Sequence, residues 1–294
     1  MYEILKKRNL ANNIFLMEIY APEVTRNCNP GQFIITRIDE DGERIPLTIC
    51  DYDREKGAIT IVFQIVGATT MKMSKLNQGD KLKDFVGPLG NESEFVHKKE
   101  ELKNKKIIFI AGGVGTAPVY PQATWLKENG IASDVFIGAK NNDLAILEEE
   151  MKKVAKNLYV TTDDGSNGKK GLVTDVLKEL TDCGKHYDLC IAIGPLIMMK
   201  FVCKLTKQLN IPTIVSLNPI MVDGTGMCGA CRVLVDNQVK FACIDGPEFD
   251  GHKVDFDNAI NRAIMYKNEE TRAILKLEEG ETHHGGCGFC GGDK

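Results

Sequence analysis

The stretch K-K-I-I-F-I-A-G-G-V-G-T-A-P, residues 105–118, decides the fold of the middle of this chain. Its first seven residues, two lysines followed by five apolar residues, have the pattern of a buried strand. The glycines that follow lead into a predicted helix over residues 119–128, which Gly130 ends. A strand, a glycine-rich turn and a helix in this order let the backbone approach a dinucleotide pyrophosphate. The turn is therefore a candidate nucleotide site, and ordinary turn chemistry is the alternative.

Strands and helices alternate from this turn to residue 217. Further strands are predicted over 133–139, 158–162, 189–193 and 213–217, with helices over 144–156, 172–181 and 197–209. This alternation predicts an α/β doubly wound parallel sheet with helices on both faces. Ligands in such sheets lie beyond the carboxyl ends of the strands. The candidate residues there are Gly112, Gly113, Val114, Gly115, Thr116, Asp163, Asp164, Gly194 and Pro195.

The first hundred residues have a different pattern, that of an antiparallel β-barrel. Short runs rich in β-branched and aromatic residues occupy 13–20, 32–38, 45–50, 58–66 and 81–86, with turn residues between them. Two stretches look chemical: R-I-P-L-T at 44–48 and G-A-T-T at 67–70, which opens a short helix whose amides could hold a phosphate. A solvated strand end and a simple helix cap are the alternatives.

Downstream of the sheet, cysteines and an aspartate have the spacing of a cluster-binding loop. Asp223 stands four residues before Cys228, Cys231 follows two residues after that, and Cys243 comes eleven residues later. Two-iron ferredoxins of the plant type space their ligands C-x4-C-x2-C with a distant fourth cysteine, so Asp223 occupies the first ligand position. A structural zinc site is the alternative, but no second C-x2-C or histidine pair lies nearby at the required spacing.

Composition limits the remaining choices. The chain has 294 residues, 43% of them hydrophobic, and a net charge of -4 with dispersed basic residues, so a nucleic-acid partner is not expected. No signal peptide or membrane-spanning run is predicted, which favours a cytoplasmic protein without a membrane partner. Ten cysteines then favour metal or redox use over disulfides. Those without partner spacing are expected to be ordinary buried or semi-exposed residues: Cys28, Cys50, Cys183, Cys190 and Cys203.

These patterns divide the chain into four parts. We expect an antiparallel β-barrel domain over 1–97, an α/β nucleotide domain over 98–217, a small cluster domain over 218–250 and a helical tail over 251–294. The tail carries one or two amphipathic helices within 256–277, expected to pack on this chain or on a partner. Its terminus offers a metal site or a dithiol, with a glycine-rich unstructured end as the alternative, at His283, His284, Cys287 and Cys290.

The order of the motifs resembles that of the ferredoxin reductase-like flavoproteins that carry a C-terminal two-iron cluster. The resemblance covers about residues 1–250 and runs through R-I-P-L-T, G-A-T-T, G-G-V-G-T-A-P, T-D-D-G, G-P and the cysteine loop. This branch includes the electron-transfer subunit of class 1B dihydroorotate dehydrogenase, whose cluster has four cysteine ligands. It also includes the small subunit of NADH-dependent ferredoxin:NADP oxidoreductase, which uses one aspartate and three cysteines. Asp223 favours the latter.

The resemblance implies roles for the candidate residues. Arg44, Pro46, Leu47 and Thr48 would line the isoalloxazine and ribityl chain of FAD, and Gly67, Thr69 and Thr70 would hold its pyrophosphate. Residues 112–116 would lie under the NAD pyrophosphate, with Asp163, Asp164, Gly194 and Pro195 nearer the ribose and nicotinamide. No catalytic acid or base is expected, because a hydride passes directly between cofactors.

The resemblance also implies a function. The chain would be the electron-transfer subunit of an electron-bifurcating flavoenzyme, passing electrons between a larger flavin and iron-sulfur partner subunit and NAD(H) through a 2Fe-2S cluster and FAD. Electron-transfer subunits of dihydroorotate dehydrogenase or sulfide dehydrogenase are alternatives, and a non-catalytic regulatory module binding NAD and zinc is a remote one. Lys140 could meet a 2′-phosphate, but no arginine cluster accompanies it, so NAD is favoured over NADP.

Overall fold

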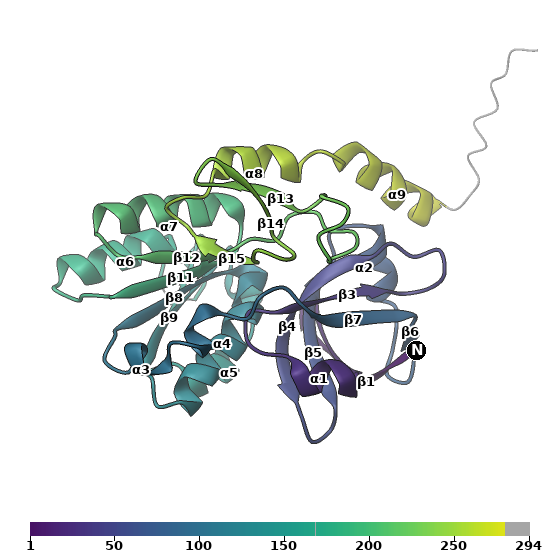
Figure 1. Ribbon diagram of the computed structural model, residues 1–294, viewed down its shortest axis with the longest axis horizontal. Coiled ribbons are helices and arrows are strands. Elements are labelled where there is room, and N and C mark those ends of the chain that lie inside the picture. Colours follow the sequence, from purple (N-terminus) through teal and green to yellow (C-terminus); the bar gives the residue numbers. More distant parts are fainter. Residues whose placement is uncertain (168, 280–294) are drawn as a thin grey trace, which may run out of the picture.

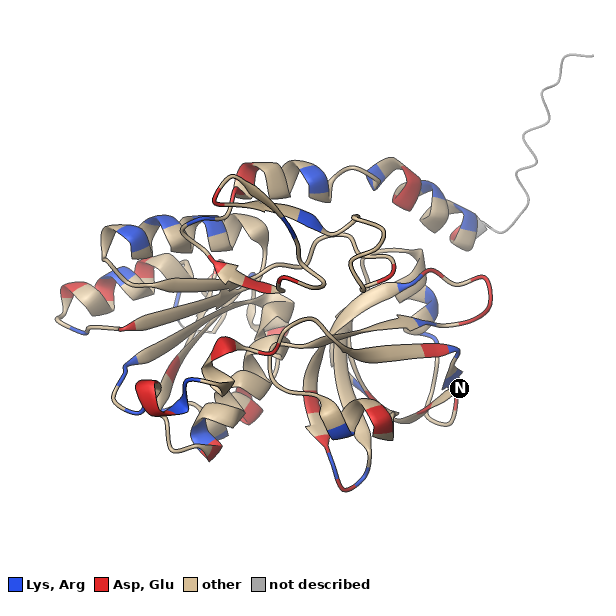
Figure 2. Cartoon of the chain, viewed as in Figure 1, with Lys and Arg blue, Asp and Glu red and all other residues tan. Residues whose placement is uncertain are grey.

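The computed structural model describes residues 1–167 and 169–279. Two sheets lie side by side, and a small hairpin and two C-terminal helices run across one end of the gap between them (Figure 1). The tail candidates His283, His284, Cys287 and Cys290 lie outside the described residues. No helix in the described part combines the length and apolarity needed to cross a bilayer. Acidic and basic residues are interspersed over the outer helices and loops (Figure 2).

The N-terminal sheet is the predicted antiparallel barrel, nearly closed, with strand order β6-β1-β2-β5-β4-β3-β7. Its interior is filled by large apolar side chains, among them the fully buried Met17, Phe63 and Phe85. Two short helices lie in its connections, α1 (Pro22–Asn27) and α2 (Ala68–Met73). The strands are β1 (Tyr2–Ala11), β2 (Ile14–Tyr20), β3 (Phe33–Arg37), β4 (Ile45–Asp53), β5 (Ala58–Gln64), β6 (Lys81–Leu82) and β7 (Asp84–Leu89).

Two details of the barrel differ from the sequence prediction. The strand β1 was not predicted, because its run of Lys6, Lys7 and Arg8 breaks the apolar pattern, and Ile4 is its only fully buried residue. Pairing of β1 along β2 nevertheless gives its backbone groups hydrogen-bond partners. The single strand predicted over 81–86 is divided into β6 and β7, which pair with β1 and β3 respectively.

The second sheet is the predicted nucleotide-type sheet, with strand order β10-β9-β8-β11-β12-β15. Side chains of β8 alternate between two cores: Phe109 packs with helices α4 and α5 on one face, and Ile108 and Ile110 with α6 and α7 on the other. The strands are β8 (Ile107–Gly112), β9 (Ser133–Ala139), β10 (Asn157–Thr162), β11 (Leu189–Ile193), β12 (Thr213–Ser216) and β15 (Glu248–Asp250). The helices are α3 (Lys99–Leu102), α4 (Thr116–Glu128), α5 (Glu148–Val154), α6 (Val173–Asp182) and α7 (Leu196–Gln208).

The predicted sheet was wholly parallel, but the observed sheet has one antiparallel strand at its edge. The last strand, β15, pairs antiparallel with β12 through Ser216 and Glu248. Three residues are too short a run to show a period in the sequence, and β15 follows the cluster loop rather than a helix. The chain therefore returns to the edge of the nucleotide sheet after making the cluster segment.

The cluster segment is a two-stranded hairpin, β13 (Arg232–Val235) and β14 (Gln238–Phe241), closed by Asp236 and Asn237. Both turn residues have positive φ, 54° and 58°, as a tight two-residue hairpin requires. Its loop packs on the barrel, because buried Cys231 and Cys243 share an apolar core with Phe33 of β3. Helices α8 (Phe256–Ala263) and α9 (Lys267–Glu279) follow, in the region where one or two helices were predicted.

A buried hydrogen-bond network joins the three parts of the molecule. Glu248 of β15 accepts hydrogen bonds at Oε1 from Ser93 Oγ, in the connection after the barrel, and from Gln122 Nε2 of α4, each at 2.8 Å. Glu248 Oε2 and Gln122 Oε1 are buried without partners among the described residues. Burial raises the pKa of the Glu248 carboxyl to about 7. A proton on this carboxyl would provide the donor that these two orphaned oxygens lack.

We expect Glu248→Gln to remove a pH dependence of stability. The folded protein binds this proton more tightly than the unfolded chain, so the stabilisation is complete below pH 4.5 and is lost as the pH rises through about 7. A shift of this size corresponds to roughly 3 kcal/mol. Urea unfolding of both proteins from pH 5 to 8 should show the variant gaining stability relative to wild type as the pH rises. Parallel curves would contradict the assignment.

Candidate functional site

One cavity of about 1870 Å³ lies between the barrel, the carboxyl edge of the nucleotide sheet and residues 216–222. Pockets for a single small molecule or cofactor are typically about 300–1000 Å³. The cavity is therefore larger than a pocket for one cofactor, which suits a flavin together with a nicotinamide nucleotide. Most of the sequence-predicted cofactor residues line it: Arg44, Pro46, Leu47, Thr48, Thr70, Gly112, Gly113, Val114, Gly115, Asp163, Gly194 and Pro195.

The barrel wall of this cavity is built by the strand β4. Pairing of Leu47 with Ile34 and of Thr48 with Phe33 fixes this strand against β3. Pro46 sits in the same ladder opposite Ile35, where its missing N–H limits pairing. The stretch R-I-P-L-T thus presents an apolar surface with one hydroxyl and one cation, which suits the flat ring of a flavin. Its contact with FAD remains a prediction.

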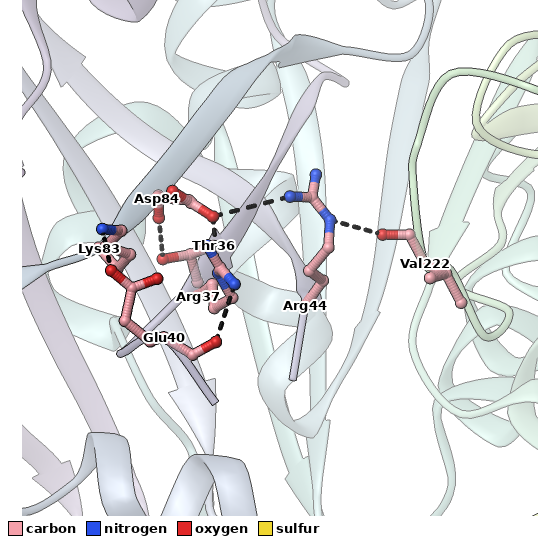
Figure 3. Close-up of polar contacts among 7 residues, drawn as sticks. All are labelled: Thr36, Arg37, Glu40, Arg44, Lys83, Asp84 and Val222. Atoms are coloured by element: carbon pink, nitrogen blue, oxygen red, sulfur yellow. Dashed lines mark hydrogen bonds and ion pairs between the residues drawn. The ribbon is translucent and has the colours of Figure 1, made fainter. Parts of the chain in front are cut away.

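Arg44 also bridges the barrel to the cluster segment (Figure 3). Its Nε donates to the carbonyl oxygen of Val222 at 2.9 Å, and its Nη1 lies 3.8 Å from Asp84 Oδ2. Arg37 donates to the same Asp84 oxygen at 2.7 Å, so this carboxylate is held by two guanidinium groups. Arg44 therefore holds the loop backbone directly before Asp223, in addition to its predicted role at the flavin.

The G-A-T-T stretch is only partly turned toward the cavity. Thr70 lines it, but Gly67 and Thr69 do not. The hydroxyl of Thr70 accepts from the backbone N–H groups of Val66 and Gly67, both at 3.0 Å, and Thr69 Oγ1 donates to the Glu43 carboxylate. Both hydroxyls are thus occupied by protein groups, and their predicted contact with the FAD pyrophosphate stays untested.

The glycines in and beside the nucleotide turn are required for different structural reasons. A Cβ on Gly115 would lie 2.2 Å from the carbonyl oxygen of Ile193, and one on Gly194 would lie 3.0 Å from Gly112 Cα. These three glycines therefore let β8 and β11 end close together. Gly113, with φ of 54°, has no neighbour near its missing Cβ and leaves backbone open to the cavity. Thr116 does not line the cavity, because it is buried and its hydroxyl donates to Gly113 O at 2.9 Å.

The ends of β9, β10 and β11 complete the nucleotide wall. Asp163 and Lys140 line the cavity, whereas Asp164 does not. The carboxylate of Asp164 accepts from the backbone N–H of Ser166 at 2.9 Å, and hydrogen bonds from Ser166 lower the pKa of that carboxyl. Asp164 therefore stabilises its own turn, and Asp163 is the acidic residue of the pair that faces the cavity.

The cysteine loop brings two of its predicted ligands into contact. Cys231 Sγ and Cys243 Sγ lie 3.2 Å apart in the buried core beside the barrel, too far for a disulfide bond of about 2.05 Å. Cys228 is exposed at the surface. Gly224, Gly226 and Gly229 all have positive φ, which curls the backbone around the loop. Adjacent sulfurs in a glycine-rich loop suit an iron-sulfur cluster.

Asp223 faces its own loop rather than the thiols. Its two oxygens accept from Thr225 N and Cys228 N, both at 2.8 Å, and these hydrogen bonds lower the pKa of its carboxyl. Within residues 1–167 and 169–279, no group of three or more histidine, cysteine, aspartate or glutamate side chains is arranged to hold a metal ion. To bind iron, the Asp223 carboxylate would therefore have to give up at least one of these two hydrogen bonds from backbone N–H groups.

The thiols differ in reactivity according to burial. Burial, with Cys231 alongside, raises the pKa of the Cys243 thiol to about 12, so binding of a cluster must release protons. Burial also raises the pKa of the thiols of Cys28, Cys50, Cys190 and Cys203. These four are buried, as expected, whereas Cys183 is exposed and departs from that expectation.

The sequence analysis missed the residues that the C-terminal helices contribute. Tyr266, Glu269 and Glu270, at the start of α9, line the cavity on the side of α2. Glu43 and Lys204 also line it. No motif surrounds these residues, and only the amphipathic pattern of the tail indicated that it packs on the rest of the chain.

Two family descriptions match parts of the chain. The iron-sulfur cluster binding domain of dihydroorotate dehydrogenase B matches residues 218–255, and the oxidoreductase NAD-binding domain matches residues 109–204. The first range contains Asp223 and all three loop cysteines, and the second contains the glycine turn.

Three similar proteins extend the comparison to almost the whole chain. An uncharacterized Clostridium beijerinckii protein encoded in the adh 3′ region is 63% identical over 100% of both chains. A Thermotoga maritima homolog of the electron-transfer subunit of dihydroorotate dehydrogenase B is 47% identical, covering 91% of this chain and 92% of its own. The solved structure of an NADH-dependent reduced ferredoxin-NADP oxidoreductase, studied for flavin-based electron bifurcation, is 44% identical with a TM-score of 0.87, covering 95% and 98%.

Replacing Asp223 by cysteine tests the predicted ligand set. If Asp223 binds iron, a thiolate in its place donates more charge, so the EPR spectrum of the reduced cluster and its reduction potential should both change. Asp245→Asn is the control, because Asp245 also caps a backbone N–H beside the loop but is not a predicted ligand. An unchanged spectrum and potential in Asp223→Cys would count against ligation by this aspartate.

Proposed function

The chain belongs to the family of dihydroorotate dehydrogenase B electron-transfer subunits and their homologues, and on that premise we propose that it carries electrons between NAD(H) and a larger partner subunit. The proposed unit is the small subunit of an electron-bifurcating NADH-dependent ferredoxin:NADP oxidoreductase. The observation that carries this proposal is the single cavity shared by the flavin-type barrel and the nucleotide turn, with the cysteine loop against its wall.

The residues of the chain would hold and orient the cofactors rather than transfer protons. Leu47 and Thr48 would support the flavin ring from the barrel, and Gly113 would present open backbone to the NAD pyrophosphate. When bound, FAD would exchange a hydride with NAD(H) and single electrons with a 2Fe-2S cluster. Cys231 and Cys243 would hold that cluster on the barrel side of the loop, close to the residues that pack under the cavity.

The exposed rim of the cysteine loop is suited to a partner protein. Met227 is 89% exposed, and Val222 and Ile244 are about half exposed around the surface thiol of Cys228. Exposed apolar side chains gathered on one loop are typical of protein contacts. We propose that the partner subunit docks here and exchanges single electrons with the cluster. A cytoplasmic location remains a prediction.

A second candidate is the electron-transfer subunit of a dihydroorotate dehydrogenase. It is favoured by the family of the cluster domain and by the name of the Thermotoga maritima relative. Asp223, in the position of a cysteine ligand, favours the first candidate. The two are distinguished by whether the partner subunit oxidises dihydroorotate.

Rapid mixing of Cys231→Ser with NADH tests the proposed electron path. Loss of one thiolate should remove the cluster, so that flavin absorbance bleaches at the wild-type rate while reduction of a one-electron acceptor slows by about tenfold or more. Cys183→Ser, at an exposed cysteine outside the site, should behave as wild type in both assays. Wild-type acceptor reduction by a Cys231→Ser protein without iron would contradict the path.

A further inference from the structure

The C-terminal helices form an elbow at the mouth of the cavity. Helix α8 is anchored on the nucleotide sheet and cluster hairpin: Phe256 is buried in the core, Lys200 Nζ lies 2.6 Å from Asp257 Oδ1, and Arg262 Nη2 donates to Ala230 O at 3.2 Å. Helix α9 then leaves that support and runs toward the barrel, where it contacts α2 (Figure 1). The elbow between them thus bridges from one sheet to the other.

The side chains at this elbow have few partners. Tyr266 is 51% exposed, and among the described residues its ring meets no other aromatic ring and its hydroxyl makes no hydrogen bond. No cation in the described part of the chain pairs with Glu269 or Glu270. All three line the cavity together with Thr70 of α2. The elbow that follows the anchored helix α8 thus leaves an aromatic ring and two carboxylates open to the cavity.

The chemistry of the tyrosine ring and the two carboxylates indicates which part of a cofactor they could bind. A tyrosine ring stacks on a flat base. Carboxylates accept hydrogen bonds from an amino group or from ribose hydroxyls, and like charge excludes them from phosphates. An uncharged nucleoside end offers both a base and these donors. The neighbouring α2 carries Thr69 and Thr70, the residues predicted for the FAD pyrophosphate, whereas the NAD turn lies on the other sheet.

We propose that the α8–α9 elbow is a clasp for the adenosine end of FAD. Tyr266 stacks on the adenine, and Glu269 and Glu270 accept hydrogen bonds from the adenosine. This inference rests on the proposed function, because it takes FAD as the flavin in the cavity. The matched cluster domain ends at residue 255, so the clasp lies outside both family domains found in the chain.

Flavin binding by the full-length chain, freed of flavin, tests the clasp. FMN carries the same ring, ribityl chain and first phosphate without the adenosine end, so it reports on the rest of the flavin site. Titrations followed by flavin fluorescence should show that Tyr266→Ala weakens FAD binding by about tenfold, the scale of one base stacked on one aromatic ring, and leaves FMN binding unchanged. Tyr266→Phe should keep wild-type FAD affinity, and Glu269→Gln with Glu270→Gln should weaken FAD but not FMN.

Tyr20→Ala is the matched control, because Tyr20 is 49% exposed on β2 and does not line the cavity. Unchanged FAD affinity in Tyr266→Ala, or equal losses for FAD and FMN, would overturn the clasp while leaving the proposed function intact. A loss of NADH affinity in place of FAD affinity would also overturn it. A wild-type chain that binds neither flavin would contradict the proposed function and the clasp together.

Discussion

The buried hydrogen bonds of Glu248 fix the three parts of this molecule relative to one another. Ser93 lies at the exit of the barrel, Gln122 on the first helix of the nucleotide domain, and Glu248 five residues after the last loop cysteine. A charge at this junction would be costly to bury, so the network is most stable when the carboxyl is neutral. These hydrogen bonds hold together the barrel, the nucleotide sheet and the cluster segment, which together surround the cavity.

The cavity follows from that arrangement. Because the cluster segment packs on β3 through Cys231 and Cys243 and then returns to the nucleotide sheet as β15, it closes the space between the two sheets from one side. Arg44 reinforces the closure by holding Val222. That no catalytic acid or base is needed stays a prediction. In the proposed function, the residues of the chain place the ring, nucleotide and thiol sites around one space.

The sequence predicted the classes of structure well, because each depends on a local pattern. The apolar run before Gly112 and the strand and helix alternation after it are sufficient for the α/β sheet, and the spacing of the loop cysteines for the cluster domain. Three features escaped prediction for physical reasons. The strand β1 is charged on its outer face, β15 has only three residues, and the contribution of Tyr266 to the cavity depends on the path of a helix pair through space. Asp164 and Thr116 show the converse, since their side chains lie in predicted cofactor motifs but turn away from the cavity to hydrogen-bond within their own turns.

The central claim is that one chain connects NAD(H), a flavin and an iron-sulfur cluster. An anaerobic titration of the purified protein with NADH, followed by visible absorption and low-temperature EPR on the same sample, tests it most directly. The account predicts that the flavin band bleaches and that the EPR signal of a reduced 2Fe-2S cluster develops. A colourless protein that contains zinc and no iron, after anaerobic purification with iron supplied, would contradict it and favour a regulatory role.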